Sequence, residues 1–217
     1  AESLVAINQT LGTNVMLNEK DLVTFTKLRE AAGFTNEELM GIQQLTLANG
    51  ATLKENTGEF LAQAQASAAQ NGVLLNEKEL LKGISDVSAA ITLSFGKNPA
   101  LIADAVATTK ALGMELSQVD AIADSLLNFE QSIANELEAE LLLGKNINLE
   151  KARQAALNND LATVAKEIAD QAGTSAEFAA MNRLQQEALA KSVGMSREDL
   201  AQTLFVQEQL AGATGEE

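Results

Sequence analysis

One local pattern recurs along this chain and limits what it can fold into. A glycine is followed by apolar residues and then by Ser, Thr or Asn, with an acidic residue three positions later. Glycine commonly ends a helix, and a hydroxyl or amide side chain with an acid three residues on commonly begins one. The pattern follows six glycines, in reduced form at the last two: Gly33, Gly72, Gly113, Gly194, Gly50 and Gly173. It predicts a series of helices with short connections.

Several helix starts can be placed from individual residues. Thr35 is predicted to cap a helix with Glu38, and Ser196 to cap the last helix with Asp199. Pro99 suits the first position of a helix, where its missing N–H costs nothing. Further caps are predicted at Asn18, Thr52, Asn76, Asn98, Asn148, Asp160 and Thr174 or Ser175. Residues 1–9 are expected to form a short helix, and residues 211–217 a frayed tail.

The longest predicted helix runs from Ser117, as the cap with Asp120, to Gly144. Its apolar residues recur at steps of three and four: Val119, Ile122, Leu126, Phe129, Ile133, Leu137 and Leu141. We predict that this stripe is the central packing surface and that the six acids beside it face water or a basic partner. Phe129→Ala would then cost about 3–5 kcal/mol. Replacing Glu136 and Glu140 by Gln would leave the fold as stable or slightly more stable.

The fold class predicted is all-α, an irregular bundle of about ten short-to-medium helices with one long central helix. Residues 85–95 contain a brief apolar alternation, but we favour a helix there because no partner strand is visible. We predict an N-terminal helical module over 1–113 and an acidic helical module over 114–217, or one continuous domain. The glycine spacing is too irregular for a regular repeat array.

Composition and charge exclude several classes of function. The net charge is −15, with 18 acids against 7 bases after residue 110, so a nucleic-acid backbone or an anionic membrane is an unsuitable partner. No apolar run approaches the roughly 18 residues of a membrane-spanning helix. Cys and His are absent, which excludes the common zinc sites and the nucleophile pairs that need His.

The remaining candidate sites are weak. Gly96-Lys97 and Gly144-Lys145 end like a phosphate loop but lack its first glycine and its final Ser or Thr. Two pairs of acids lie four residues apart, as general acids and bases could: Asp120 with Asp124, and Glu136 with Glu140. Without Trp or Tyr to form a sugar platform, we interpret them as a solvated acidic face. The sequence thus predicts no catalytic, cofactor-binding or metal-binding residue, and a protein that is not an enzyme.

Three stretches resemble segments of tail tape measure proteins from tailed bacteriophages and prophages. The first two are Leu112-Gly-Met-Glu-Leu-Ser-Gln-Val119 and the run from Glu136 to Ala162, which includes Leu142-Leu-Gly-Lys-Asn-Ile-Asn-Leu-Glu-Lys-Ala152. The third runs from Gln186 to Ala201 and includes Ser192-Val-Gly-Met-Ser-Arg-Glu-Asp-Leu200. The similarity lies in stretches of helix-forming sequence and does not involve catalytic residues.

The resemblance implies a helix-rich virion protein that lies in the tail tube, sets tail length and leaves the tube as DNA is delivered. Its partners would be tail tube, tail chaperone or baseplate proteins, and its location the phage tail, after assembly in the host cytoplasm. Family members are much longer, so the chain is expected to be a fragment or one helical domain. The alternative function is that of a helical scaffold domain of a cellular protein. A peptidoglycan-degrading enzyme is the least favoured function of the three.

Overall fold

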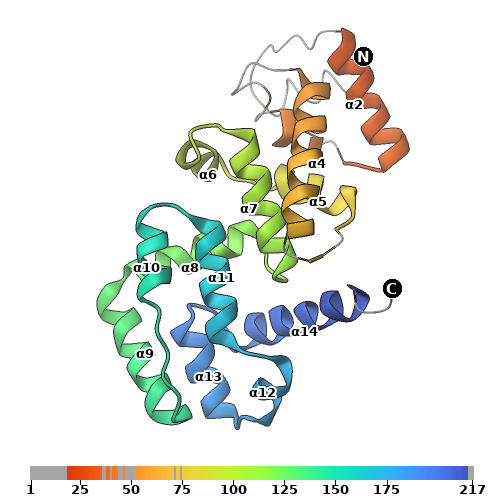
Figure 1. Ribbon diagram of the computed structural model, residues 1–217. Helices are drawn as coiled ribbons and strands as arrows, with labels where there is room; N and C mark the ends of the chain where they lie inside the picture. Colours follow the sequence, from red (N-terminus) through yellow and green to blue (C-terminus); the bar gives the residue numbers. More distant parts are fainter. Residues whose placement is uncertain are drawn as a thin grey trace. The chain divides into compact units, whose positions relative to one another are not determined.

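The computed structural model describes residues 19–35, 38–39, 41–43, 46, 52–70, 72–73 and 75–214 (Figure 1). These residues form α-helices joined by turns and short connections, and no β-strand occurs among them. The predicted all-α class is confirmed. The predicted helix over residues 1–9 and the predicted cap at Asn18 lie outside the described residues.

The helices vary from one and a half turns to five turns in length. In chain order they are α2 (Glu19–Ala32), α4 (Leu53–Gln70), α5 (Glu77–Ser85), α6 (Ala89–Ser94), α7 (Pro99–Ala111), α8 (Leu116–Leu127), α9 (Phe129–Leu143), α10 (Glu150–Leu157), α11 (Leu161–Ala172), α12 (Ser175–Ala180), α13 (Arg183–Ser192) and α14 (Arg197–Thr214).

The contacts divide the chain into two compact units. The first consists of Ala1–Ala66 and Asn76–Ala103, and the second of Ser67–Leu75 and Asp104–Glu217. The sequence placed two modules at 1–113 and 114–217. In the structure the second unit also includes the last turn of α4, from Ser67, and its main part begins within α7, at Asp104.

In the first unit, one apolar cluster forms part of the core. Its fully or nearly fully buried members are Phe25, Phe34, Leu39, Ile42, Leu53 and Leu81. The predicted capping box is confirmed here: Thr35 Oγ1 accepts from Glu38 N at 3.2 Å, and Glu38 Oε2 accepts from Thr35 N at 2.8 Å. Phe34 and Leu39 flank the box and are both buried, so the box fixes the chain direction as it enters the core.

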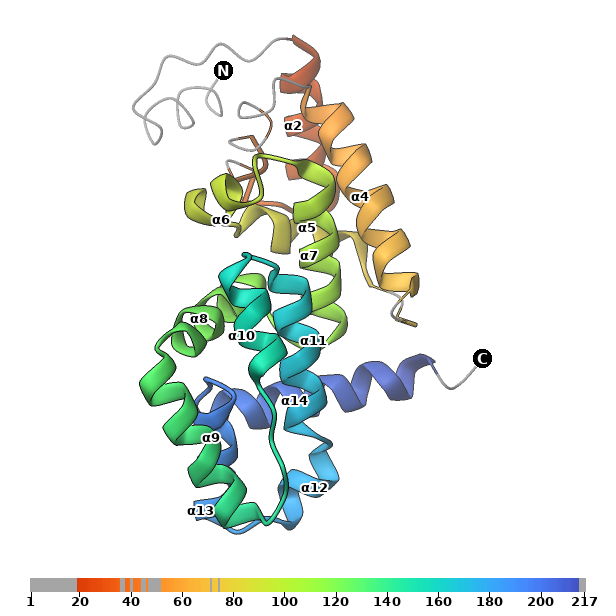
Figure 2. The ribbon, with the colours of Figure 1, turned by 60° about the vertical axis from the view of Figure 1, so that its left-hand side comes forward.

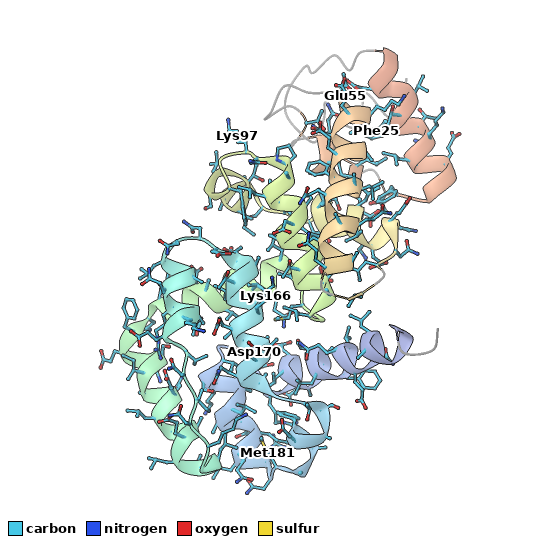
Figure 3. All side chains as sticks on the ribbon, viewed as in Figure 1. Phe25, Glu55, Lys97, Lys166, Asp170 and Met181 are labelled. Atoms are coloured by element: carbon cyan, nitrogen blue, oxygen red, sulfur yellow. The ribbon has the colours of Figure 1, made fainter. Side chains whose placement is uncertain are left out.

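Other predicted helix starts are confirmed by their hydrogen bonds. Thr52 and Glu55 form a second reciprocal pair at the start of α4, the end near which Figure 3 shows Glu55. Side chains of Asn76, Asn98, Asp160, Thr174 and Ser196 each accept an N–H from the first turn of the following helix. The ambiguous residues 85–95 contain α6, capped by Ser88, and the helical interpretation is confirmed.

The second unit has two groups of packed helices. Helices α8, α10 and α11 contact one another, and α13 lies along α9 while α14 contacts α12 and α13 (Figure 2). Buried residues of the first group include Val119, Ile122, Leu126, Ala152, Ala156, Val164, Ala165 and Ile168. The small alanines of α10 and α11 permit the close approach of these helices.

The prediction of one long helix from Ser117 to Gly144 is wrong. The chain leaves the helical conformation at Asn128, with ψ at 76°, which ends α8 and begins α9. The helix also starts earlier, at Leu116, after Glu115, and Ser117 makes no cap. Asn has a low helix propensity because its side chain competes with the backbone for hydrogen bonds. The apolar periodicity continues past Asn128, and so it conceals the break.

Two boundaries further along also differ from prediction. Thr174 caps a helix as predicted, but this helix ends at Ala180, and a second capping box that was not predicted, formed by Asn182 and Gln185, begins α13. This box matches the general pattern of a cap followed three residues later by Glu or Gln, and could have been found in the sequence. The last helix continues to Thr214, beyond the predicted start of the frayed tail at Ala211.

Candidate functional site

Helix α9 is held from one side by α13, which runs antiparallel to it. The amide of Asn135 donates to the Lys191 carbonyl at 3.3 Å, and the amide of Gln185 donates to the Leu142 carbonyl at 3.0 Å. Between these two hydrogen bonds, Ala139 is fully buried. A small residue at this position lets the two helix backbones approach, so α9 is fixed in both register and direction.

A second side of α9 is held by the connection to α10. Glu136 Oε2 pairs with Arg153 Nη2, and Glu136 Oε1 accepts the Leu149 N–H at 3.4 Å. Glu140 Oε1 accepts the Ile147 N–H at 3.0 Å. The connecting residues therefore run back along α9 as an extended segment whose backbone is bound by carboxylates (Figure 2).

These contacts correct the prediction that Glu136 and Glu140 form a solvated acidic face. Arg153 is largely buried and also donates from Nε to Ser132 Oγ at 3.1 Å. Burial lowers the pKa of the Arg153 guanidinium from its ordinary value. Both oxygens of Glu136 are occupied by protein groups, so the pair of acids joins α9 to α10 and we assign it a structural role.

The other predicted pair of acids, Asp120 and Asp124, lies on α8. Partial burial, and to a smaller degree the charge of Asp124, raise the pKa of the Asp120 carboxyl. Asp124 is exposed. The Asp120 carboxyl therefore binds a proton more readily in the folded chain than an aspartate in water does.

The third side of α9 carries large apolar side chains that remain about half-exposed or more among the described residues. Phe129, Ile133, Leu137 and Leu141 are 45%, 47%, 54% and 86% exposed. Residues four apart on a helix form a continuous ridge, so these four make one apolar stripe on the surface. We call this set the α9 ridge. The sequence identified its members correctly as one face, but placed them in the core.

The two glycine-lysine pairs whose sequence partly matches a phosphate loop are helix ends in the structure. Gly96 and Lys97 both have positive φ, and Lys97 N donates to Thr92 O at 2.9 Å at the end of α6 (Figure 3). Gly144 has φ of 64° and donates to Glu140 O at 2.9 Å, which ends α9. In both places the backbone N–H group donates to a carbonyl in the last turns of the helix that ends there.

Within the part of the chain that the structure describes, no group of three or more acidic side chains is arranged to hold a metal ion. None of the described helices combines the length and the apolar character needed to cross a bilayer.

Comparisons of the chain with protein-family models, with curated proteins and with solved structures give no match. The exposed α9 ridge is the structural observation from which a function can be inferred.

Proposed function

We propose that this chain is a structural segment of a phage tail tape measure protein and acts through contacts with other proteins. The α9 ridge is the observation that supports the broader half of this proposal, namely that the chain acts through contacts with other proteins. Large apolar side chains scattered singly on a surface are ordinary, but four on one helical ridge mark a place where another protein binds. The particular assignment rests on the resemblance, whose longest stretch covers the second half of α9, all of α10 and the first residues of α11.

The way in which the helices begin supports this proposal. Several caps join residues only three positions apart, as in the Thr174–Glu177 and Asn182–Gln185 boxes. Such bonds form within one helix and do not depend on packing against a neighbour. Helices that carry their own caps can persist when the chain extends, as a protein lying along a tail tube must.

The experiment is to change the length of the segment in a phage that encodes it. A helix rises about 1.5 Å per residue, so an in-frame duplication of residues 116–214 lengthens the tail by about 150 Å, and deletion of the same residues shortens it equally. Tail length is measured by electron microscopy of purified particles. Mass spectrometry of the same particles checks that the protein is present.

Tails of unchanged length, or particles without the protein, would contradict the proposal. The second candidate, a helical scaffold domain of a cellular protein, would then account for the α9 ridge. That candidate is favoured by the same exposed surface but requires no tail, and it predicts that the protein is found in host complexes in uninfected cells.

A further inference from the structure

Two sides of α9 are covered within the described structure, and the α9 ridge lies on a third side, where its four side chains are 45–86% exposed. Helix α13 covers one side, and the segment that Glu136 and Glu140 bind covers another. The remaining surface is one apolar ridge, three helical turns long, at the edge of the second unit (Figures 1 and 2). A ridge of residues four apart fits the groove of another helix.

The charges beside the ridge limit what kind of helix can bind. Glu130 and Glu138 directly follow Phe129 and Leu137 in the sequence, and both acids are exposed. Residues 116–143 include six acids and neither Lys nor Arg. A partner helix therefore meets apolar side chains in the middle of the contact and exposed carboxylates at its margin.

A second copy of this chain is a poor occupant of the ridge. If two α9 helices packed ridge against ridge, Glu130 and Glu138 of one copy would lie among the same acids of the other. Like charges placed together across an interface disfavour the complex. A partner with bases at the corresponding positions gains attraction where a second copy gains repulsion.

We infer that the α9 ridge binds an amphipathic helix of another protein whose apolar stripe is flanked by Lys or Arg. This inference rests on the proposed function, because it names the class of partner through which the segment acts. Apolar contact along the ridge supplies most of the affinity, and the acids select the partner and orient it.

The experiment uses synthetic peptides of about 20 residues, long enough to be helical in part before binding. One peptide has a Leu stripe at helical spacing flanked by Lys, and a second has the same stripe flanked by Glu. A third keeps the Lys residues but has Ser in the stripe, and so reports attraction to the net charge of −15 alone. Binding to the full chain is measured by fluorescence anisotropy.

The Lys-flanked Leu peptide is expected to bind about tenfold or more tightly than either of the others. Leu137→Ala with Ile133→Ala weakens its binding by about tenfold or more. Leu157→Ala is the matched control, because Leu157 at the end of α10 is also a leucine that is 54% exposed. Glu130→Lys with Glu138→Lys reverses the preference, so that the Glu-flanked peptide binds more tightly.

Three results would overturn the inference. Equal binding of the Lys-flanked and Glu-flanked peptides would exclude selection by charge, and an equal effect of Leu157→Ala would exclude the ridge. Dimerisation of the wild-type chain in sedimentation equilibrium, lost in Leu137→Ala, would make a second copy the occupant. Circular dichroism of each variant establishes that it is folded. Because peptide binding needs no phage, failure here leaves the tail-length experiment unaffected, and the converse also holds.

Discussion

Arg153 on α10 forms an ion pair with Glu136 on α9, and the two side chains are only 11% and 16% exposed. The guanidinium also donates to Ser132 Oγ, and the carboxylate also accepts the Leu149 N–H. A pair with this little exposure is costly to break from one side, because the remaining charge stays partly buried without its partner.

Glu136→Gln is therefore expected to lower the free energy of unfolding by about 3 kcal/mol. The sequence predicted instead that replacing Glu136 and Glu140 together by Gln would leave the fold as stable or slightly more stable, because it treated them as a repelling, solvated pair. Glu138→Gln is the control, since Glu138 lies on the same helix and is exposed, and it should change stability by less than about 0.5 kcal/mol. Urea titration of both variants tests the difference. Equal stability of the two would show that the ion pair does not hold α9 to α10.

Leu126→Ala and Phe129→Ala should have very different effects although they lie one turn apart. Leu126 is 1% exposed, and its truncation is expected to cost about 2–5 kcal/mol through lost burial and a cavity. Phe129 is 45% exposed, so its truncation should cost about 1 kcal/mol or less. Thermal unfolding of the two variants measures this contrast. A cost for Phe129→Ala as large as that for Leu126→Ala would place Phe129 in a core after all.

Ser196→Ala and Thr35→Ala should each cost about 1 kcal/mol, because each removes the acceptor of a first-turn N–H. The bonds concerned join Ser196 Oγ to Asp199 N at 3.1 Å and Thr35 Oγ1 to Glu38 N at 3.2 Å. Ser117→Ala is a control with the same chemical change, because Ser117 lies inside α8 and caps nothing. Its midpoint in a thermal melt should stay within error of the wild type. A drop as large as in Ser196→Ala would restore the helix start predicted at Ser117.

Asp120 gives a pH-dependent effect with a definite sign. Its folded-state pKa is raised, first by burial and then by Asp124, so the folded chain binds a proton there more readily than the unfolded chain does. The ionised carboxyl thus costs stability above its raised pKa, and this cost disappears as pH falls below the ordinary pKa of Asp.

Asp120→Asn is therefore expected to melt at a higher temperature than the wild type at pH 7, with a gap that closes towards about pH 3.5. Asp124→Asn removes only the smaller, Coulombic cause and should give the smaller gain. Calorimetry at the two pH values tests both variants. A gap that widens on acidification would mean that the Asp120 carboxylate is stabilised in the folded chain.

The features that were predicted correctly are local ones. A cap depends on residues three positions apart, so Thr35 with Glu38 and Asp160 with Thr163 can be recognised in the sequence and are found in the structure. The all-helical class follows from the same repeated signals. The break at Asn128 was missed because the apolar spacing passes through it without interruption.

The candidate site could not be predicted because it depends on which faces are covered. Periodicity groups Phe129, Ile133 and Leu137 on one face of a helix, but it cannot tell whether a neighbour packs there. Helix α13 contacts α9 on a different face. The face that is covered depends on residues more than 40 positions away in the sequence, such as Gln185, whose amide donates to the Leu142 carbonyl. In the same way, Glu136 gives no sign in the sequence that Arg153 is its partner.

The segment between α9 and α10 offers a direct view of how firmly α9 is attached. Ile147 and Leu149 lie outside any helix, yet both are buried and their amides are bonded to Glu140 and Glu136. Amides with such partners exchange their hydrogens with solvent only when the partners separate. The exchange rates of these two amides therefore report the opening of α9 from the rest of the second unit, at two positions along one helix.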